Sequence, residues 1–296
     1  MSEECTHNCS TCGDSGCSAK EQSKESLNEH SSIKKIIAIT SGKGGVGKSS
    51  VTSAIAVMMS RIGYRVGILD ADITGPSIPR AFGLEPGHVQ GNDNFMLPNI
   101  TKTGIRIMSL NLLVQNETDA VAWRGPIITN TVKQFYTDVI WDDLDFLFID
   151  MPPGTGDVAL TVFQSIPLDG LIFVTSPQDL VSMVVEKGMN LSAKMQVKAL
   201  GIVENYAYFL CPDNNKKYAI FGNSKIKDIC EKHHVDLLGQ LRINPEFASL
   251  VDSGKVEDMD VSEYVSIAEM LMKMLPMEDE CSCCGDCCDG CDDCGE

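Results

Sequence analysis

The sequence contains no run of about 18 apolar residues, and it does not begin with a basic stretch followed by an apolar one. The first absence argues against a transmembrane helix, and the second argues against a secretory signal. We therefore expect a cytoplasmic protein without stable membrane association, in which thiols stay reduced.

Positive charge is also scarce. The chain has 24 lysine and arginine residues against 41 aspartate and glutamate residues, which gives a formal net charge of −17. No basic stripe is available to follow a phosphate backbone, so we do not expect direct binding of nucleic acid. Acidic residues instead gather in residues 278–296, which hold eight of them and no basic residue.

Cysteine is nearly absent from the middle of the chain and abundant near both ends. Of thirteen cysteines, four lie within residues 5–17 and seven within residues 281–294. An odd total in a reducing setting argues against a disulfide framework and favours metal ligation. Cysteine content and charge predict a flexible Cys-rich arm (1–35), a globular domain (36–277) and an acidic Cys-rich tail (278–296).

The globular domain alternates apolar runs with segments of helical periodicity. Because the runs are apolar throughout and helices separate them, they predict an α/β fold with a mostly parallel sheet covered by helices on both faces. The predicted strands are residues 36–40, 66–69, 105–109, 145–149, 171–175, 199–204 and 236–241. The predicted helices are residues 48–62, 125–138, 157–165, 179–195, 223–233, 245–253 and 262–275.

The most informative motif is a glycine-rich stretch between the first predicted strand and helix. It matches G-x-x-x-x-G-K-S, a loop whose backbone N–H groups cradle nucleotide phosphates. We expect Lys48 to reach the β- and γ-phosphates and the Ser49 hydroxyl to bind Mg²⁺. A second cation, Lys43, could neutralise charge on the transferred phosphoryl group. The predicted phosphate-binding residues are Gly42, Lys43, Gly44, Gly45, Val46, Gly47, Lys48, Ser49 and Ser50.

Acidic residues follow two of the predicted strands. Alternation along the first of them puts Asp70 and Asp72 on one face, and Asp150 follows the strand at 145–149. The carboxyl ends of parallel strands meet at one edge of the sheet, beside the phosphate loop. One carboxylate could hold a Mg²⁺-bound water and another could orient the attacking water, while Asp150 suits the Walker B position. The loop at 151–157, with two prolines and two glycines, could respond to the γ-phosphate.

Five segments together resemble a known family. GKGGVGKSS, LDADITGPS, WRGPIITNTVKQF, FLFIDMPPGTGD and GIVENYAYF are similar, in order and spacing, to segments of the Mrp/ApbC family. These are ATP-binding iron–sulfur carrier proteins within the MinD/ParA/nitrogenase iron-protein class of deviant-loop ATPases. The resemblance covers about residues 33–275.

The resemblance implies that the protein works as a homodimer with shared nucleotide sites. Lys43 resembles the signature lysine that crosses the dimer interface to the partner's nucleotide. Lys48 and Ser49 match the loop lysine and the Mg²⁺ ligand, and Ser50 matches the α-phosphate contact. Lys43 and Lys48 are therefore catalytic candidates.

The resemblance also implies roles for four residues at strand ends. Asp72 resembles the residue that orients water for hydrolysis, which makes it the third catalytic candidate. Asp70 and Asp150 match the acids around Mg²⁺. Asn205 resembles an asparagine that reads adenine, and its carboxamide can donate and accept at once, as a purine edge requires.

The chain departs from the family at one place. The family usually carries C-P-x-C after the segment that contains Asn205, and two such pairs would hold a bridging [4Fe–4S] cluster across the dimer. Here the segment reads Cys211-Pro212-Asp213-Asn214. Two Cys211 thiolates fall short of the roughly four ligands that a cubane cluster needs. Cys211 is therefore a weak candidate, and so is Asp213 as a substitute ligand.

The Cys-rich ends offer replacement ligands. The cysteines within residues 5–17 resemble a cluster in one branch of the family and could wrap a [4Fe–4S] cluster or Zn²⁺. The cysteines of the acidic tail could hold one cluster or several softer ions. The candidate ligands are Cys5, Cys9, Cys12, Cys17, Cys281, Cys283, Cys284, Cys287, Cys288, Cys291 and Cys294.

Motifs and resemblance together predict an ATP-hydrolysing carrier or scaffold that assembles an iron–sulfur cluster, [4Fe–4S] in type, or transfers it to apo-proteins. Two alternatives stay open: an ATP-regulated thiolate protein for Zn²⁺ or Cu⁺, and a MinD- or ParA-like positioning switch. An electron donor like the nitrogenase iron protein is disfavoured, because residues 73–210 contain no cysteine.

Overall fold

The computed structural model describes residues 24–72, 77–92, 94–114, 125–177, 181–222 and 224–276. The predicted cysteine ligands in residues 5–17 and 281–294 lie outside these ranges. No helix within the described ranges has the length and apolar character needed to cross a membrane.

The described strands form one nine-stranded sheet. They are β1 (Ser31–Ser41), β2 (Val66–Asp70), β3 (Asn99–Ile100), β4 (Arg106–Ser109), β5 (Asp142–Asp150), β6 (Gly170–Thr175), β7 (Ala199–Leu210), β8 (Lys217–Tyr218) and β9 (Leu237–Arg242). Their order is β3-β4-β2-β5-β1-β6-β7-β8, and β9 also pairs with β7. The pairs are parallel except β3 with β4 and β7 with β8, so the predicted mostly parallel sheet is confirmed.

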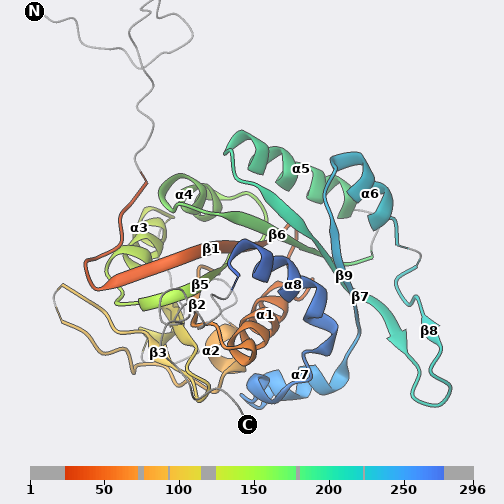
Figure 1. The fold of residues 1–296 in the computed structure, drawn as a ribbon, viewed down its shortest axis with the longest axis horizontal. Coiled ribbons are helices and arrows are strands. Elements are labelled where there is room, and N and C mark those ends of the chain that lie inside the picture. The colour runs from red at the N-terminus through yellow and green to blue at the C-terminus, as the bar shows by residue number, and fades with distance from the viewer. Residues whose placement is uncertain are drawn as a thin grey trace, which may run out of the picture.

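Helices cover both faces of this sheet (Figure 1). They are α1 (Lys48–Ile62), α2 (Ile78–Ala81), α3 (Gly125–Thr137), α4 (Asp157–Ser165), α5 (Val181–Lys194), α6 (Ile226–His233), α7 (Pro245–Asp252) and α8 (Val265–Met274). The described residues also form short 3-10 turns, which are η1 (Leu110–Leu112), η2 (Val256–Asp258) and η3 (Ser262–Tyr264). Helices α1, α7 and α8 lie on one face, and α3 to α6 lie on the other.

Two apolar cores, one on each face, hold these layers together. Alternation along the central strand β1 sends Ile37 and Ile39 into the core beneath α1 and α8. Ile36 and Ala38 point into the core beneath α3 and α4. A central strand buried on both sides must be apolar at nearly every position, which explains why the sequence could locate it.

All seven predicted strands and all seven predicted helices are present, with differences at their ends. Strand β1 begins at Ser31 rather than at residue 36, and β7 continues to Leu210 rather than ending at residue 204. The first five residues of β1 alternate between half-buried and exposed, so they lack the continuous apolar run that marks a buried strand. The two-residue strands β3 and β8 and the four-residue helix α2 are too short to give a periodic signal.

The residues before β1 are attached to the domain. The backbone N–H of Glu25 donates to the carbonyl of Ser165 at 2.8 Å. The Asn28 side chain donates to the carbonyls of Thr137 and Val139 at 2.9 and 2.8 Å. The division of the chain at residues 35 and 277 stays a prediction.

Candidate nucleotide-binding site

The glycine-rich motif forms the loop between β1 and α1. Gly45 and Gly47 have φ angles of 79° and 78°, in the left-handed region that other residues rarely adopt. Gly47 is the N-cap of α1, and its carbonyl accepts a hydrogen bond from the N–H of Val51 at 2.9 Å. A Cβ atom at Gly47 would lie 2.2 Å from Nδ2 of Asn205. The backbone path therefore requires glycine at position 47. The loop places the positive end of the α1 dipole where an anion can bind.

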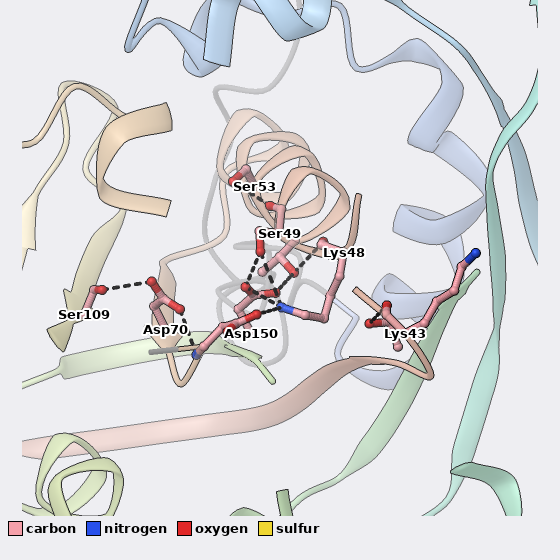
Figure 2. Close-up of polar contacts among 10 residues, drawn as sticks. Lys43, Lys48, Ser49, Ser53, Asp70, Ser109 and Asp150 are labelled. Atoms are coloured by element: carbon pink, nitrogen blue, oxygen red, sulfur yellow. Dashed lines mark hydrogen bonds and ion pairs between the residues drawn. The ribbon is translucent and has the colours of Figure 1, made fainter. Parts of the chain in front are cut away.

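Lys48 is the first residue of α1, and its side chain is buried. Its Nζ lies 2.7 Å from Oδ2 of Asp150 and 3.4 Å from Oδ2 of Asp72. Burial lowers the pKa of Lys48, but the nearby carboxylates outweigh this effect and raise the pKa above its ordinary value. Lys48 is therefore a fixed positive charge beside the phosphate loop (Figure 2).

Asp150 ends β5 and is fully buried. Its Oδ2 accepts a hydrogen bond from Oγ of Ser49 at 2.6 Å, and its Oδ1 accepts one from Oγ1 of Thr52 at 2.8 Å. The parallel register of β1 and β5 places Asp150 opposite Ile39, just before the phosphate loop begins. Sheet register and the first turn of α1 therefore bring the predicted Walker B acid to the predicted Mg²⁺ ligand.

Asp70 ends β2, and the register pairs it with Asp150 on one side and with Ser109 on the other. Its Oδ2 accepts a hydrogen bond from Oγ of Ser109 at 2.8 Å, and its Oδ1 accepts one from the backbone N–H of Asp72 at 3.0 Å. Burial, followed by repulsion from Asp150, raises the pKa of Asp70 to about 8. Asp72 is also buried, and its carboxylate faces Lys48.

The oxygen atoms at this edge suit Mg²⁺ in part. Hydroxyl and carboxylate oxygens are the ligands that Mg²⁺ prefers, and Ser49, Asp70 and Asp150 supply them within one cluster. Within the described ranges, however, no group of three or more His, Cys, Asp or Glu side chains is placed to hold a metal ion by itself. The donor set therefore fits a magnesium ion that takes its remaining ligands from nucleotide phosphates and water.

Lys43 differs from Lys48 in where its side chain points. Figure 2 shows it directed away from the cluster of Lys48, Ser49 and Asp150. Its carbonyl accepts a hydrogen bond from Oγ of Ser41 at 3.0 Å, which fixes the start of the loop. This direction is compatible with a lysine that acts outside its own phosphate loop, and that role stays a prediction.

Asn205 lies directly against the phosphate loop. Its Nδ2 donates to the carbonyl of Val46 at 3.0 Å, and its Oδ1 accepts from the backbone N–H of Tyr206 at 2.9 Å. Tyr206 has a φ of 59°, unusual for a tyrosine, and this conformation brings its hydroxyl over Gly47. The carboxamide therefore supports the loop in this structure, a contact that the sequence did not indicate.

A cavity of about 180 Å³ opens beside Ser50 and Asn205. Apart from Tyr206 of β7, the rest of its wall comes from β9, α7, η3 and the loop residues beside them, which the sequence did not connect to the site. These wall residues include Tyr206, Leu241, Arg242, Asn244, Phe247, Ala248, Val251, Asp252, Met259, Asp260, Glu263 and Tyr264. One signal was present in the sequence: Asn244-Pro245 starts a helix at the carboxyl end of a strand, the sheet edge where ligands bind.

The loop after β5 is tied to the phosphate loop. The backbone N–H groups of Met151 and Gly154 donate to the carbonyls of Ile39 and Ser41 at 3.0 and 2.8 Å. A cavity of about 190 Å³ separates this loop and Gly42 from α5. Because these hydrogen bonds join the two loops, a shift of one loop would displace the other. The predicted response of the loop after β5 to the γ-phosphate requires such a connection.

The two cysteines of the domain have different surroundings. Cys230 is buried in α6, and burial raises the pKa of its thiol. Cys211 is half-buried just beyond β7, where its N–H donates to the carbonyl of Lys216 at 3.0 Å. Asp213 is exposed in the following turn. The cluster sites predicted in residues 5–17 and 281–294 lie outside the described residues.

Comparison with known proteins places this arrangement in a family. Residues 32–275 match the model of a ParA-type family described as NUBPL iron-transfer P-loop NTPase. An iron–sulfur cluster carrier protein of Clostridium perfringens is 42% identical over 83% of this chain and 88% of its own length. A cytosolic iron–sulfur cluster assembly factor of Chaetomium globosum is 39% identical over 80% of this chain and 86% of its own length.

Solved structures agree with this assignment. A nucleotide-binding protein from Archaeoglobus fulgidus, in complex with ADP, is 39% identical with a TM-score of 0.70 and covers 79% of this chain and 91% of its own. The cell-division ATPase MinD of Pyrococcus furiosus shares the fold, with a TM-score of 0.59 at 20% identity over 81% of this chain and 99% of its own. Given the match over residues 32–275, the chain belongs to the ParA-type family of NUBPL iron-transfer P-loop NTPases.

Proposed function

We propose that the protein is an ATP-dependent carrier that assembles an iron–sulfur cluster, [4Fe–4S] in type, and transfers it to apo-proteins in the cytoplasm. The observation that carries this proposal is the similarity to iron–sulfur cluster carrier proteins at about 40% identity over most of the chain. The cluster is cargo, and its proposed ligands are the cysteines of residues 5–17 and 281–294.

The phosphate loop gives the protein its nucleotide chemistry. The backbone N–H groups of residues 42–50 would hold the phosphates at the start of α1. Lys48, which now pairs with Asp150, would turn its ammonium group to the β- and γ-phosphates. Mg²⁺, held by Ser49 with Asp70 and Asp150 around it, would neutralise developing phosphate charge.

Two further residues complete the proposed hydrolysis site. Asp72, whose carboxylate already faces Lys48, would orient the water that attacks the γ-phosphate. Lys43 points away from its own loop, and we assign it to the nucleotide of the partner in a homodimer. Closure of the dimer on ATP and its relaxation after hydrolysis would then couple the nucleotide to the cargo.

The cavity beside Ser50 and Asn205 is the proposed site of the adenine base. Tyr264 and Phe247 contribute aromatic side chains to its lining, and Asn244 and Arg242 contribute polar ones. Such a mixture of an apolar slot with few polar groups is typical of small-molecule sites. The Asn205 carboxamide would give up its hydrogen bond to the Val46 carbonyl and form hydrogen bonds with the edge of the purine instead.

Anaerobic reconstitution with iron and sulfide tests this function. Absorption and Mössbauer spectra should show a bound cluster, and an apo-acceptor enzyme should regain activity faster when ATP is present. Lys48→Ala should keep the cluster and lose the ATP effect, because it removes the phosphate contact and no proposed cluster ligand. Protein that holds only tight Zn²⁺ and passes no cluster to the acceptor would overturn the proposal.

A further inference from the structure

Thr52 lies on α1 one helical turn after Lys48, and its side chain is completely buried. Its Oγ1 lies 2.8 Å from Oδ1 of Asp150 and 3.0 Å from the carbonyl oxygen of Lys48. The hydroxyl has a single hydrogen, and the shorter distance and the charge of the carboxylate favour its donation to Asp150. Thr52 therefore holds one oxygen of the Walker B acid from the side of the helix.

The two oxygens of Asp150 have different partners. Oδ2 accepts a hydrogen bond from Oγ of Ser49 and pairs with Nζ of Lys48, as Figure 2 shows. Both of these partners have another task once nucleotide binds, because Lys48 turns to the phosphates and Ser49 binds Mg²⁺. The hydrogen bond from Thr52 to Oδ1 has no part in either task, so it can persist and hold the carboxylate when the ion pair opens.

The orientation of this carboxylate matters for the choice of metal. A carboxylate without partners turns easily, because the torsion that sets its plane has broad minima. Mg²⁺ demands near-ideal octahedral geometry, whereas Ca²⁺ accepts a flexible shell of oxygen ligands. Removing a group that orients a metal-binding side chain typically costs about 10- to 100-fold in metal affinity or activity. A fixed Asp150 therefore favours Mg²⁺ over Ca²⁺.

We propose that Thr52 is a positioning residue for the magnesium site, and that its hydrogen bond to Asp150 gives the site its preference for Mg²⁺ over Ca²⁺. The inference rests on the proposed nucleotide function and adds a residue that acts through Asp150. Thr52 is itself held in place, because a β-branched side chain has few rotamers in a helix and the contact with the Lys48 carbonyl restricts it further. Its complete burial prevents water from replacing the hydroxyl.

The next residue of α1 offers a matched comparison. Ser53 is also buried, and its Oγ donates to the carbonyl of Ser49 at 2.9 Å. Both hydroxyls thus contact a carbonyl one turn earlier in the helix, and of the two it is Thr52 that also reaches Asp150. Removing the Ser53 hydroxyl therefore measures the effect of losing a buried hydroxyl from α1 while Asp150 keeps its partners.

Titration calorimetry with ADP in excess Mg²⁺, in excess Ca²⁺ and in EDTA tests this role. In the wild type, Mg²⁺ should tighten ADP binding more than Ca²⁺ does. Thr52→Val keeps the shape of the side chain and removes the hydroxyl, so ADP affinity should fall at least about tenfold in Mg²⁺, less than about threefold in Ca²⁺ and less than about twofold in EDTA. Thr52→Ser should restore the preference for Mg²⁺, and Ser53→Ala should keep all three wild-type affinities.

Several outcomes would overturn the role of Thr52 while leaving the nucleotide site intact. They are a wild type that binds ADP equally well with Mg²⁺ and with Ca²⁺, equal losses with the two metals in Thr52→Val, and the same losses in Ser53→Ala. A loss of ADP binding in EDTA in Thr52→Val would also overturn it, because the hydroxyl would then support the phosphate loop itself. Wild-type protein that binds ADP in none of the three solutions would instead contradict the proposed nucleotide function.

Discussion

Nζ of Lys48 lies 2.7 Å from Oδ2 of Asp150, so the phosphate-loop lysine and the Walker B acid form a buried ion pair when no nucleotide separates them. The same carboxylate also accepts hydrogen bonds from Ser49 and Thr52. The pair keeps two charges compensated in a site that excludes water. When nucleotide binds, Lys48 must give up this ion pair to reach the phosphates. The same two residues therefore stabilise the free protein and serve catalysis.

The variant Lys48→Ala should lose both stability and activity. Removing the ammonium group leaves Asp150 buried without its counter-charge, which typically costs about 3–5 kcal/mol in the free energy of unfolding. ATP hydrolysis should fall at least 100-fold, since the γ-phosphate loses its cation. Urea unfolding and phosphate release measure the two effects.

Lys43→Ala is the matched control for this prediction. Its side chain points away from the ion-pair cluster, so it should reduce hydrolysis while costing much less stability than Lys48→Ala. Equal losses of stability in the two variants would contradict the structural role given to the Lys48–Asp150 pair.

Two glycines of the phosphate loop should respond differently to the same substitution. Gly47→Ala forces a side chain into a φ of 78° and places Cβ 2.2 Å from Nδ2 of Asn205. We expect a loss of about 1–3 kcal/mol in stability and at least a tenfold loss of ATP affinity. At Gly44 a Cβ atom would meet nothing within 4 Å, so Gly44→Ala should be nearly neutral in stability. Thermal unfolding and nucleotide titration of both variants would show whether this contrast holds.

Much of the site could be predicted because it depends on local sequence. The phosphate loop is contiguous, and Asp70 and Asp150 end apolar strands whose carboxyl ends must meet in a parallel sheet. Contacts between distant segments could not be predicted. The hydroxyl of Ser109 reaches Asp70 only through the β2–β4 register, and Tyr264 reaches the cavity only because η3 packs near β9.

The same distinction holds for the fold. The long apolar strands and the periodic helices were located within a few residues, because burial on both faces or on one face leaves a regular pattern. The outer half of β7 was missed, since beyond Asn205 buried and half-buried side chains mix and the continuous buried run of the strand ends. The β7–β8 hairpin therefore became visible only in three dimensions.

The stability of the nucleotide-free protein should fall as pH rises. The pKa of Asp70 is raised from 3.8 to about 8, so between these values the folded state holds a proton that the unfolded state releases. The stabilisation that this proton gives the folded state is complete below about pH 4 and is lost as pH rises through 8. The free energy of unfolding should fall by at most about 1.4 kcal/mol per pH unit in this range. Denaturant unfolding at pH 6, 7, 8 and 9, without Mg²⁺, measures this slope.

Asp70→Asn serves as the control for the pH dependence. Its carboxamide keeps an acceptor for the N–H of Asp72 and a donor for Ser109, and it does not titrate. The slope between pH 6 and 8 should therefore be shallower in the variant than in the wild type. Identical slopes in the two proteins would show that Asp70 is already ionised in the folded state.

Cys211 should matter less for iron content than the cysteines of residues 5–17. Cys211 lies in the domain without a second cysteine in the C-P-x-C position, where Asn214 follows Asp213 instead. Cys211→Ala should therefore leave the iron content of reconstituted protein within about 20%, whereas deleting residues 1–17 should remove about four iron atoms per chain. Iron and sulfide analysis of anaerobically purified protein measures both effects.

The deletion of residues 278–296 separates the contributions of the two Cys-rich segments. If each holds its own cluster, the losses of iron in the two deletions should add up to the content of the full chain. If the segments share one cluster, either deletion should remove the same iron. A large loss in Cys211→Ala, together with an unchanged content after deletion of residues 1–17, would instead return the cluster to the hairpin of the domain. That outcome would require ligands beyond the two Cys211 thiolates of a dimer, because a cubane cluster needs about four.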